Sequence, residues 1–116
     1  MDRHSIISRM AARKTEKADL SKYGVEDAGD LFIRKLSAAD RSVIIDLWKA
    51  EQSTEASGYI LAAALADAEG RKIFDDPAAD SKAIINEWPC DLVDGLTTQI
   101  LTFSGLIKDE EQPEKN

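Results

Sequence analysis

The sequence predicts an α+β fold, mainly α, with three to four helices and a small antiparallel β element. Residues 38–52 follow a helix-capping signal and place apolar residues three and four positions apart, as in an amphipathic helix. Residues 91–108 carry a longer stripe of the same kind. Residues 31–36 are short, apolar and flanked by turn residues, which is typical of a strand. The 116 residues suffice for one domain with a hydrophobic core.

Residues 1–30 are predicted to be a mobile basic N-terminal segment and linker. Within residues 1–19, a helix is indicated by a weak apolar stripe made of Ile6, Ile7, Met10 and Ala11. Residues 20–30 contain two glycines and several acids, which favours a loop or hinge. Residues 1–22 hold six Lys or Arg against three acids, although the whole chain has a net charge of −7. The basic head therefore precedes a strongly acidic body.

The helical domain is expected to span residues 31–108 and to begin with the strand Leu31–Leu36. Ser37 is followed three residues later by Asp40, a pairing that caps a helix at its first turn. The helix should run from Ala38 to about Gln52, where Ser53, Thr54, Ser57 and Gly58 break the pattern. Its apolar stripe consists of Val43, Ile44, Leu47 and Trp48, with Ile45 near the edge.

The run Tyr59–Ala66 can be interpreted as a helix or a strand. Its alanine content favours a helix. Its short length and the reversal Asp67-Ala68-Glu69-Gly70 favour a strand that pairs with Arg71–Phe74, and the balance favours the strand. The glycine that closes the reversal can take the positive φ of a tight turn, and the aspartate that opens it can cap the turn.

Two further helices are predicted after the stop at Asp75-Asp76-Pro77. Asp80 should cap the first, over Ser81–Trp88, and Pro89 should end it because proline lacks an N–H group. Its apolar side consists of Ala83, Ile84 and Trp88. The stripe of the last helix consists of Leu92, Val93, Leu96, Ile100, Phe103 and Ile107, and Gly95 within it weakens the helix or allows close packing. Residues 109–116 are expected to form a disordered polar tail.

Reactive side chains are scarce in this chain. His4 is the only histidine and lies near the N-terminus, and Cys90 is the only cysteine, which we interpret as a small buried hydrophobe. The acids around Gly70 do not match the spacing of a calcium-binding loop. No glycine-rich phosphate-binding motif is present. We therefore expect a protein that is not an enzyme and uses no cofactor or metal.

Charge and hydropathy limit the classes of function and the cellular locations that remain. An acidic body repels phosphate, so nucleic-acid binding is not expected. The basic residues 1–22 are interpreted as a solvated helix face. The alternatives are that they bind an acidic partner or the acidic body of a neighbouring copy, or, as the minor one, that they bind nucleic acid. No apolar run is long enough for a signal peptide or a membrane span, which predicts a cytoplasmic protein without a membrane partner. A single cysteine fits a reducing compartment.

The order of three motifs has a parallel in a known family. The segment Phe32-Ile33-Arg34-Lys35-Leu36-Ser37 leads into a helix. An apolar run then ends in Asp67-Ala68-Glu69-Gly70 and is closed by Ile73-Phe74, and a last helix carries Ser104-Gly105 near its end. Over residues 31–108, this order resembles the tail assembly chaperones of long-tailed bacteriophages.

The resemblance implies a non-enzymatic protein of the host cytoplasm that is absent from the mature virion. Such chaperones coat the tape measure protein during tail building, help to recruit the tail tube protein and self-associate. A longer form often arises by ribosomal frameshifting, which would append a second domain at the polar tail. The alternative to this function is a small cytoplasmic adaptor or regulatory module that binds another protein.

Partner-binding residues are predicted from residue type alone. Leu47 and Trp48 can face a partner if their helix lies outside the core, and Tyr59 is a third candidate. Aromatic side chains often anchor protein interfaces because they bury a large area at low entropic cost.

Overall fold

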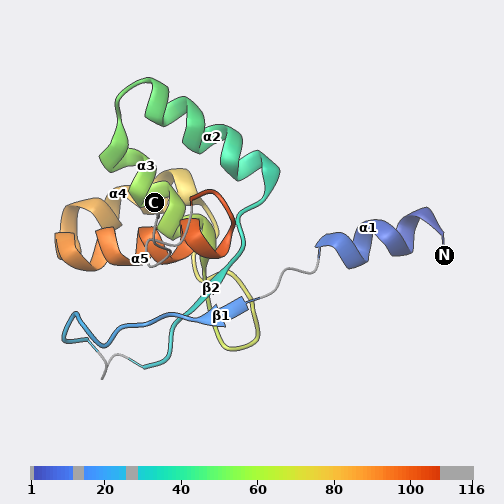
Figure 1. Cartoon of the computed structure of the whole chain (residues 1–116), viewed down its shortest axis with the longest axis horizontal. Coiled ribbons are helices and arrows are strands. Elements are labelled where there is room, and N and C mark those ends of the chain that lie inside the picture. The colour runs from blue at the N-terminus through green and yellow to red at the C-terminus, as the bar shows by residue number, and fades with distance from the viewer. Residues whose placement is uncertain (1, 12–14, 26–28, 108–116) are drawn as a thin grey trace, which may run out of the picture.

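The computed structural model describes residues 2–11, 15–25 and 29–107. These residues form five helices and three short strands (Figure 1). In chain order the elements are α1 (Arg3–Ala11), β1 (Thr15–Lys17), β2 (Phe32–Arg34), α2 (Ala38–Lys49), α3 (Ser53–Ala64), β3 (Leu65–Ala66), α4 (Pro77–Glu87) and α5 (Cys90–Phe103). The predicted α+β, mainly α class is confirmed, with one helix more than expected. The domain boundaries stay a prediction, and residues 109–116 lie outside the described part.

The three strands form one antiparallel sheet in the order β1-β2-β3. The predicted strand in residues 31–36 is confirmed as the central strand, where fully buried Ile33 lies opposite Glu16 and Leu65. The helix predicted within residues 1–19 ends at Ala11, and Thr15–Lys17 form a strand instead. Pairing with the open edge of β2 decides the conformation here, because tertiary contacts override a weak local helix pattern.

Helix α2 begins and ends with hydrogen-bonded caps. Ser37 Oγ accepts a bond from Asp40 N at 3.0 Å, and Asp40 Oδ2 accepts one from Ser37 N at 3.1 Å, so the predicted capping box is confirmed. The helix ends at Lys49, before the predicted Gln52. Glu51 takes a left-handed φ of 61°, and Gln52 N donates back to the carbonyl of Leu47, which closes the helix.

The strand interpretation of residues 59–66 is wrong for most of the run. Helix α3 spans Ser53–Ala64 and passes through Gly58, and only Leu65–Ala66 form a strand. Every residue from Ile60 to Ala66 is buried, because α2, α4 and α5 all pack against this segment. A run that is apolar on all sides fits a helix enclosed by other elements, and alanine then allows close approach. The helix alternative therefore holds.

The reversal after β3 has the predicted geometry. Gly70 has a φ of +83°, and Asp67 Oδ1 accepts bonds from the backbone N–H groups of Glu69 and Arg71 at 3.0 and 2.9 Å. The returning chain pairs with the strand through the bridge between Ala66 and Lys72. The predicted return is thus present, although it is limited to a single bridge.

The Asp67 carboxylate makes the fold depend on pH. Hydrogen bonds, first from the backbone of Arg71, hold the pKa of Asp67 below its ordinary value. Its contribution to stability is therefore present above the unfolded pKa of about 3.9 and is lost as the pH falls through the lower folded value. In urea unfolding, Asp67→Asn should be less stable than wild type near pH 7, and the difference should shrink below pH ~4. A difference that stays constant with pH would contradict this cause.

Helices α4 and α5 each begin at or directly after a proline. Asp76 caps α4, and Pro77 is its first residue, so the predicted capping role of Asp80 is wrong; Asp80 instead accepts a bond from Asp76 N at 3.3 Å. Helix α5 begins at Cys90, directly after Pro89. The thiol is exposed, which contradicts its interpretation as buried, because the first residue of this helix lies at the edge of the body.

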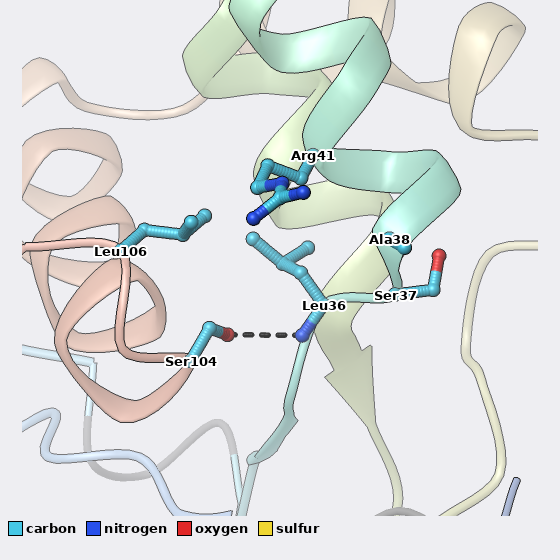
Figure 2. A pocket seen from close by; sticks show the side chains of 6 residues that line it. All are labelled: Leu36, Ser37, Ala38, Arg41, Ser104 and Leu106. Atoms are coloured by element: carbon cyan, nitrogen blue, oxygen red, sulfur yellow. Dashed lines mark hydrogen bonds between the residues drawn. The ribbon is translucent and has the colours of Figure 1, made fainter.

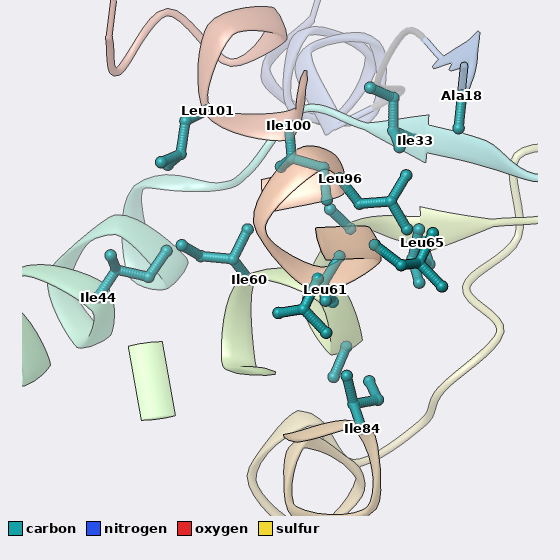
Figure 3. Close-up of a cluster of buried hydrophobic side chains, with 14 residues drawn as sticks. Ala18, Ile33, Ile44, Ile60, Leu61, Leu65, Ile84, Leu96, Ile100 and Leu101 are labelled. Carbon is teal, nitrogen blue, oxygen red and sulfur yellow. The ribbon is translucent and has the colours of Figure 1, made fainter. Parts of the chain in front are cut away.

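The hydrophobic core lies between the sheet and the helices that follow it (Figure 3). Its largest fully buried side chains are Ile33, Ile44, Ile60, Leu61, Leu65, Ile84, Leu96 and Ile100. Four residues of the predicted stripe of α5, Leu92, Val93, Leu96 and Ile100, are buried as expected. The helix ends at Phe103, which is half-buried, so the predicted extension to residue 108 is wrong and Ile107 lies beyond the helix. Of the apolar side predicted for α4, Ile84 is fully buried and Ala83 is exposed, while Trp88 is half-buried and lies just past the end of the helix. Gly95 lies against the ring of Tyr23, with which a Cβ would collide.

Candidate functional site

Helix α2 is attached to the body along a narrow line. Ile44 is its only buried residue, and Figure 3 shows this side chain directed toward Ile60 of α3. Val43 and Trp48 are each 39% exposed. Because successive helical residues are rotated by about 100°, Val43 and Trp48 lie on opposite sides of Ile44. The apolar arc of α2 is therefore wider than its contact with the body, and both of its margins are accessible.

One side of α2 carries both apolar side chains and an arginine. Arg41, Ile45 and Trp48 are spaced four and three residues apart, which places them on one side of the helix, here called the Trp48 face. Arg41 and Trp48 are exposed and Ile45 is half-buried. The aromatic ring, the isoleucine and the stem of the arginine side chain together give this face accessible apolar surface.

A pocket adjoins the Trp48 face at the first turn of α2 (Figure 2). It is lined by Leu36, Ser37, Ala38, Arg41, Ser104 and Leu106. Leu36 N donates a hydrogen bond of 2.9 Å to Ser104 Oγ, which ties the chain entering α2 to the end of α5. In Figure 2 the side chains of Arg41, Leu36 and Leu106 converge on the same space. The pocket therefore extends the accessible apolar surface from α2 toward α5.

The three predicted partner-binding residues do not form one patch. Trp48 is exposed on its face, whereas Leu47 is half-buried on the other side of Ile44. Tyr59 is half-buried and donates a bond of 3.1 Å to Asp40 Oδ1, at the opposite end of α2 from Trp48. Burial, and then the nearby Asp40 carboxylate, raise the pKa of the Tyr59 hydroxyl above its ordinary value. Tyr59 thus joins α3 to the start of α2.

A second accessible concavity lies where α3, α4 and the start of α5 meet. Ser53, Thr54 and Ser57 line one side of this α3–α5 groove, and its other lining residues are Ile85, Trp88, Cys90, Val93 and Asp94. The Trp88 ring is held by a tilted contact with Phe74, at 6.4 Å between ring centroids. Apart from Asp94, the residues that line the described groove are uncharged.

Helix α1 differs from the other helices because it has no buried residue. It projects away from the body in Figure 1. Ile6, Ile7 and Met10 are 44%, 58% and 75% exposed, so its apolar stripe is uncovered. The segment Arg3–Ala11 contains two arginines and no acid.

The described residues offer accessible surfaces for contact. In ranges 2–11, 15–25 and 29–107, no group of three or more His, Cys, Asp or Glu could hold a metal ion. Within the same ranges, no helix is long and apolar enough to cross a membrane. The sequence pattern indicated Trp48 and placed Ile45 near the edge of the apolar stripe, but it did not group them with Arg41, although the spacing of the three residues indicates one side of a helix. The α3–α5 groove gave no such signal, because its residues come from three separate helices.

Comparison with known proteins gives one informative likeness. No family model and no curated protein matches the sequence. The fold is similar to the solved structure of the bacteriophage HK97 tail assembly chaperone, with a TM-score of 0.61 and 11% sequence identity. The match covers 91% of this chain and 96% of that chain. At this identity the two proteins share a fold, and the likeness extends over nearly the whole length of both.

Proposed function

We propose that this protein is a phage tail assembly chaperone that binds apolar helical segments of a tape measure protein and helps to recruit tail tube subunits. It acts without catalysis, self-associates, works in the host cytoplasm and is absent from the mature virion. The observation that carries the proposal is the fold likeness to the HK97 chaperone over nearly the whole of both chains. A full-length match argues for the whole architecture, and not for one common supersecondary unit.

The surface of α2 supports the proposal independently. A long apolar helix that is not yet enclosed aggregates unless its apolar surface is covered. The Trp48 face offers an exposed aromatic ring, a half-buried isoleucine and an arginine stem along one helix, which suits a helical client. The net charge of −7 keeps a complex with such a client in solution. Many weak contacts along one filament would raise the effective affinity.

Rescue of an aggregating client tests the proposal. The chain is co-expressed with a long apolar helical segment of the tape measure protein from the same genome, and the soluble fraction of that segment is measured. Wild type should keep the segment soluble, and Trp48→Ala should reduce the soluble fraction several-fold because the aromatic anchor is lost. Arg41→Glu, which removes no buried group, should weaken the rescue in the same direction.

The matched control removes an equally accessible apolar side chain elsewhere. Ile73 is 46% exposed and follows the tight turn, so Ile73→Ala should leave the rescue intact. Cooperative thermal unfolding of each variant is checked first. Failure of wild type to keep the segment soluble would reject the function, and equal loss in Ile73→Ala and Trp48→Ala would reject the Trp48 face as the binding site.

A further inference from the structure

We propose that helix α1 of one copy docks into the α3–α5 groove of a second copy. Self-association is part of the proposed function, and this inference assigns it a specific pair of surfaces. Both surfaces are uncovered in the single chain: α1 has no buried residue, and the groove is open. One contact between two copies would cover both.

The apolar groups of the two surfaces match. On α1, the rotation of about 100° per residue gathers Ile6, Ile7 and Met10 on one side, together with Arg3. In the groove, the apolar lining consists of the half-buried Ile85 of α4 and Trp88 just after it, with the buried Val93 of α5 behind them. An amphipathic helix that lies in an apolar groove is a recurring mode of protein recognition.

The charges of the two surfaces are opposite. Helix α1 carries Arg3 and Arg9 and no acid. The groove carries Asp94, and the exposed Asp91 lies one turn earlier on α5, whereas no lysine or arginine lines the described groove. Opposite charges steer the two surfaces together and fix their register. The alternative receptor, the Trp48 face, carries Arg41 and would repel α1.

The placement of α1 favours exchange between copies. In Figure 1, α1 lies at one end of the longest axis of the molecule, and the junction of α4 and α5 lies toward the other end. The sheet that holds Thr15 adjoins the C-terminal end of α3, whereas Ser53 and Thr54 of the groove are at its N-terminal end. The α1 helix and the elements that form the groove of one chain therefore lie toward opposite ends of the molecule.

Directed disulfide formation tests the contact, because Cys90 is the only cysteine and lies exposed in the groove. Full-length Met10→Cys/Cys90→Ser is mixed with tagged wild type and oxidised mildly. A disulfide requires Cα atoms within about 7 Å, so a mixed dimer reports the proposed contact. Ser8→Cys/Cys90→Ser is the matched control, since Ser8 is also exposed but lies on the opposite side of α1.

We expect several-fold more mixed dimer from the Met10 variant than from the Ser8 variant. Charge exchange gives the second measurement: Asp94→Arg should raise the dissociation constant for self-association several-fold in sedimentation experiments, and Arg3→Asp/Asp94→Arg should restore it. Equal cross-linking of the two thiol variants, or no rescue by the charge exchange, would overturn the inference. The inference would also be overturned if the Met10→Cys variant with Cys90 intact formed an intramolecular disulfide at high dilution.

The outcome is separable from that of the tape measure experiment. Self-association through α1 is measured without any client, and client rescue is measured with wild type, whose α1 and groove are unchanged. Client rescue without cross-linking would remove this inference and leave the proposed function standing. Cross-linking without client rescue would leave this inference standing and reject the proposed function.

Discussion

Gly58→Val should destabilise the protein by about 2–3 kcal/mol, as observed when a close-packed core receives extra methyl groups. Gly58 lies inside α3 where α4 crosses it. A Cβ at this position would come within 2.6 Å of Ile85 Cγ2 and 2.9 Å of the Ser81 carbonyl oxygen. The isoleucine can rotate, but the carbonyl belongs to the backbone of α4, so the two helices must separate. Urea unfolding of the purified variant measures the loss.

Two companion variants isolate the steric cause of this loss. Gly58→Ala adds one carbon and gains helix propensity of about 1 kcal/mol, so its net loss should be smaller than that of valine. Thr54→Val introduces the same side chain on an exposed position of α3 and should change stability by less than ~0.5 kcal/mol. If Gly58→Val and Thr54→Val were equally stable, close packing of α3 on α4 would not be the role of this glycine.

Gly58 also explains why the sequence favoured a strand, and not a helix, for residues 59–66. Serine, threonine and glycine at positions 53–58 are typical of a break between elements, so the helix was expected to end before them. Helix α2 does end before them, but a second helix begins at Ser53 and continues through Gly58, where the missing side chain leaves room for α4 to cross. A glycine required by a neighbour that lies 23 residues further along the chain has no local signal. Only the three-dimensional contact distinguishes it from a helix breaker.

Local chemistry was, by contrast, predictable. The capping box of Ser37 and Asp40, and the turn of Asp67 and Gly70, depend on residues within four positions of each other. Such groups satisfy their hydrogen bonds in the same way in almost any fold. The residues of the candidate site differ in the same way in whether they could be predicted from the sequence. Trp48 was predicted from its own helix, whereas the α3–α5 groove requires knowledge of how three helices meet.

Ile44→Ala should cost about 2–5 kcal/mol, and the loss should be concentrated in α2. Ile44 is fully buried and is the only buried residue of this helix, so no other side chain holds α2 as firmly on α3. Regions with few buried contacts open before the rest of a protein. Amide hydrogen exchange should therefore speed up in α2 while α5, with six buried residues, stays protected.

Val43→Ala is the matched control for this variant. It shortens the neighbouring apolar side chain, which is 39% exposed, and should change stability by no more than ~1 kcal/mol without altering exchange in α5. Because the Trp48 face belongs to α2, Ile44→Ala should also lose client rescue although most of the fold persists. Uniform acceleration of exchange in all helices would mean that α2 unfolds only together with the body. The Trp48 face would then be a rigid part of the core structure, and Ile44 would not be its separate attachment point.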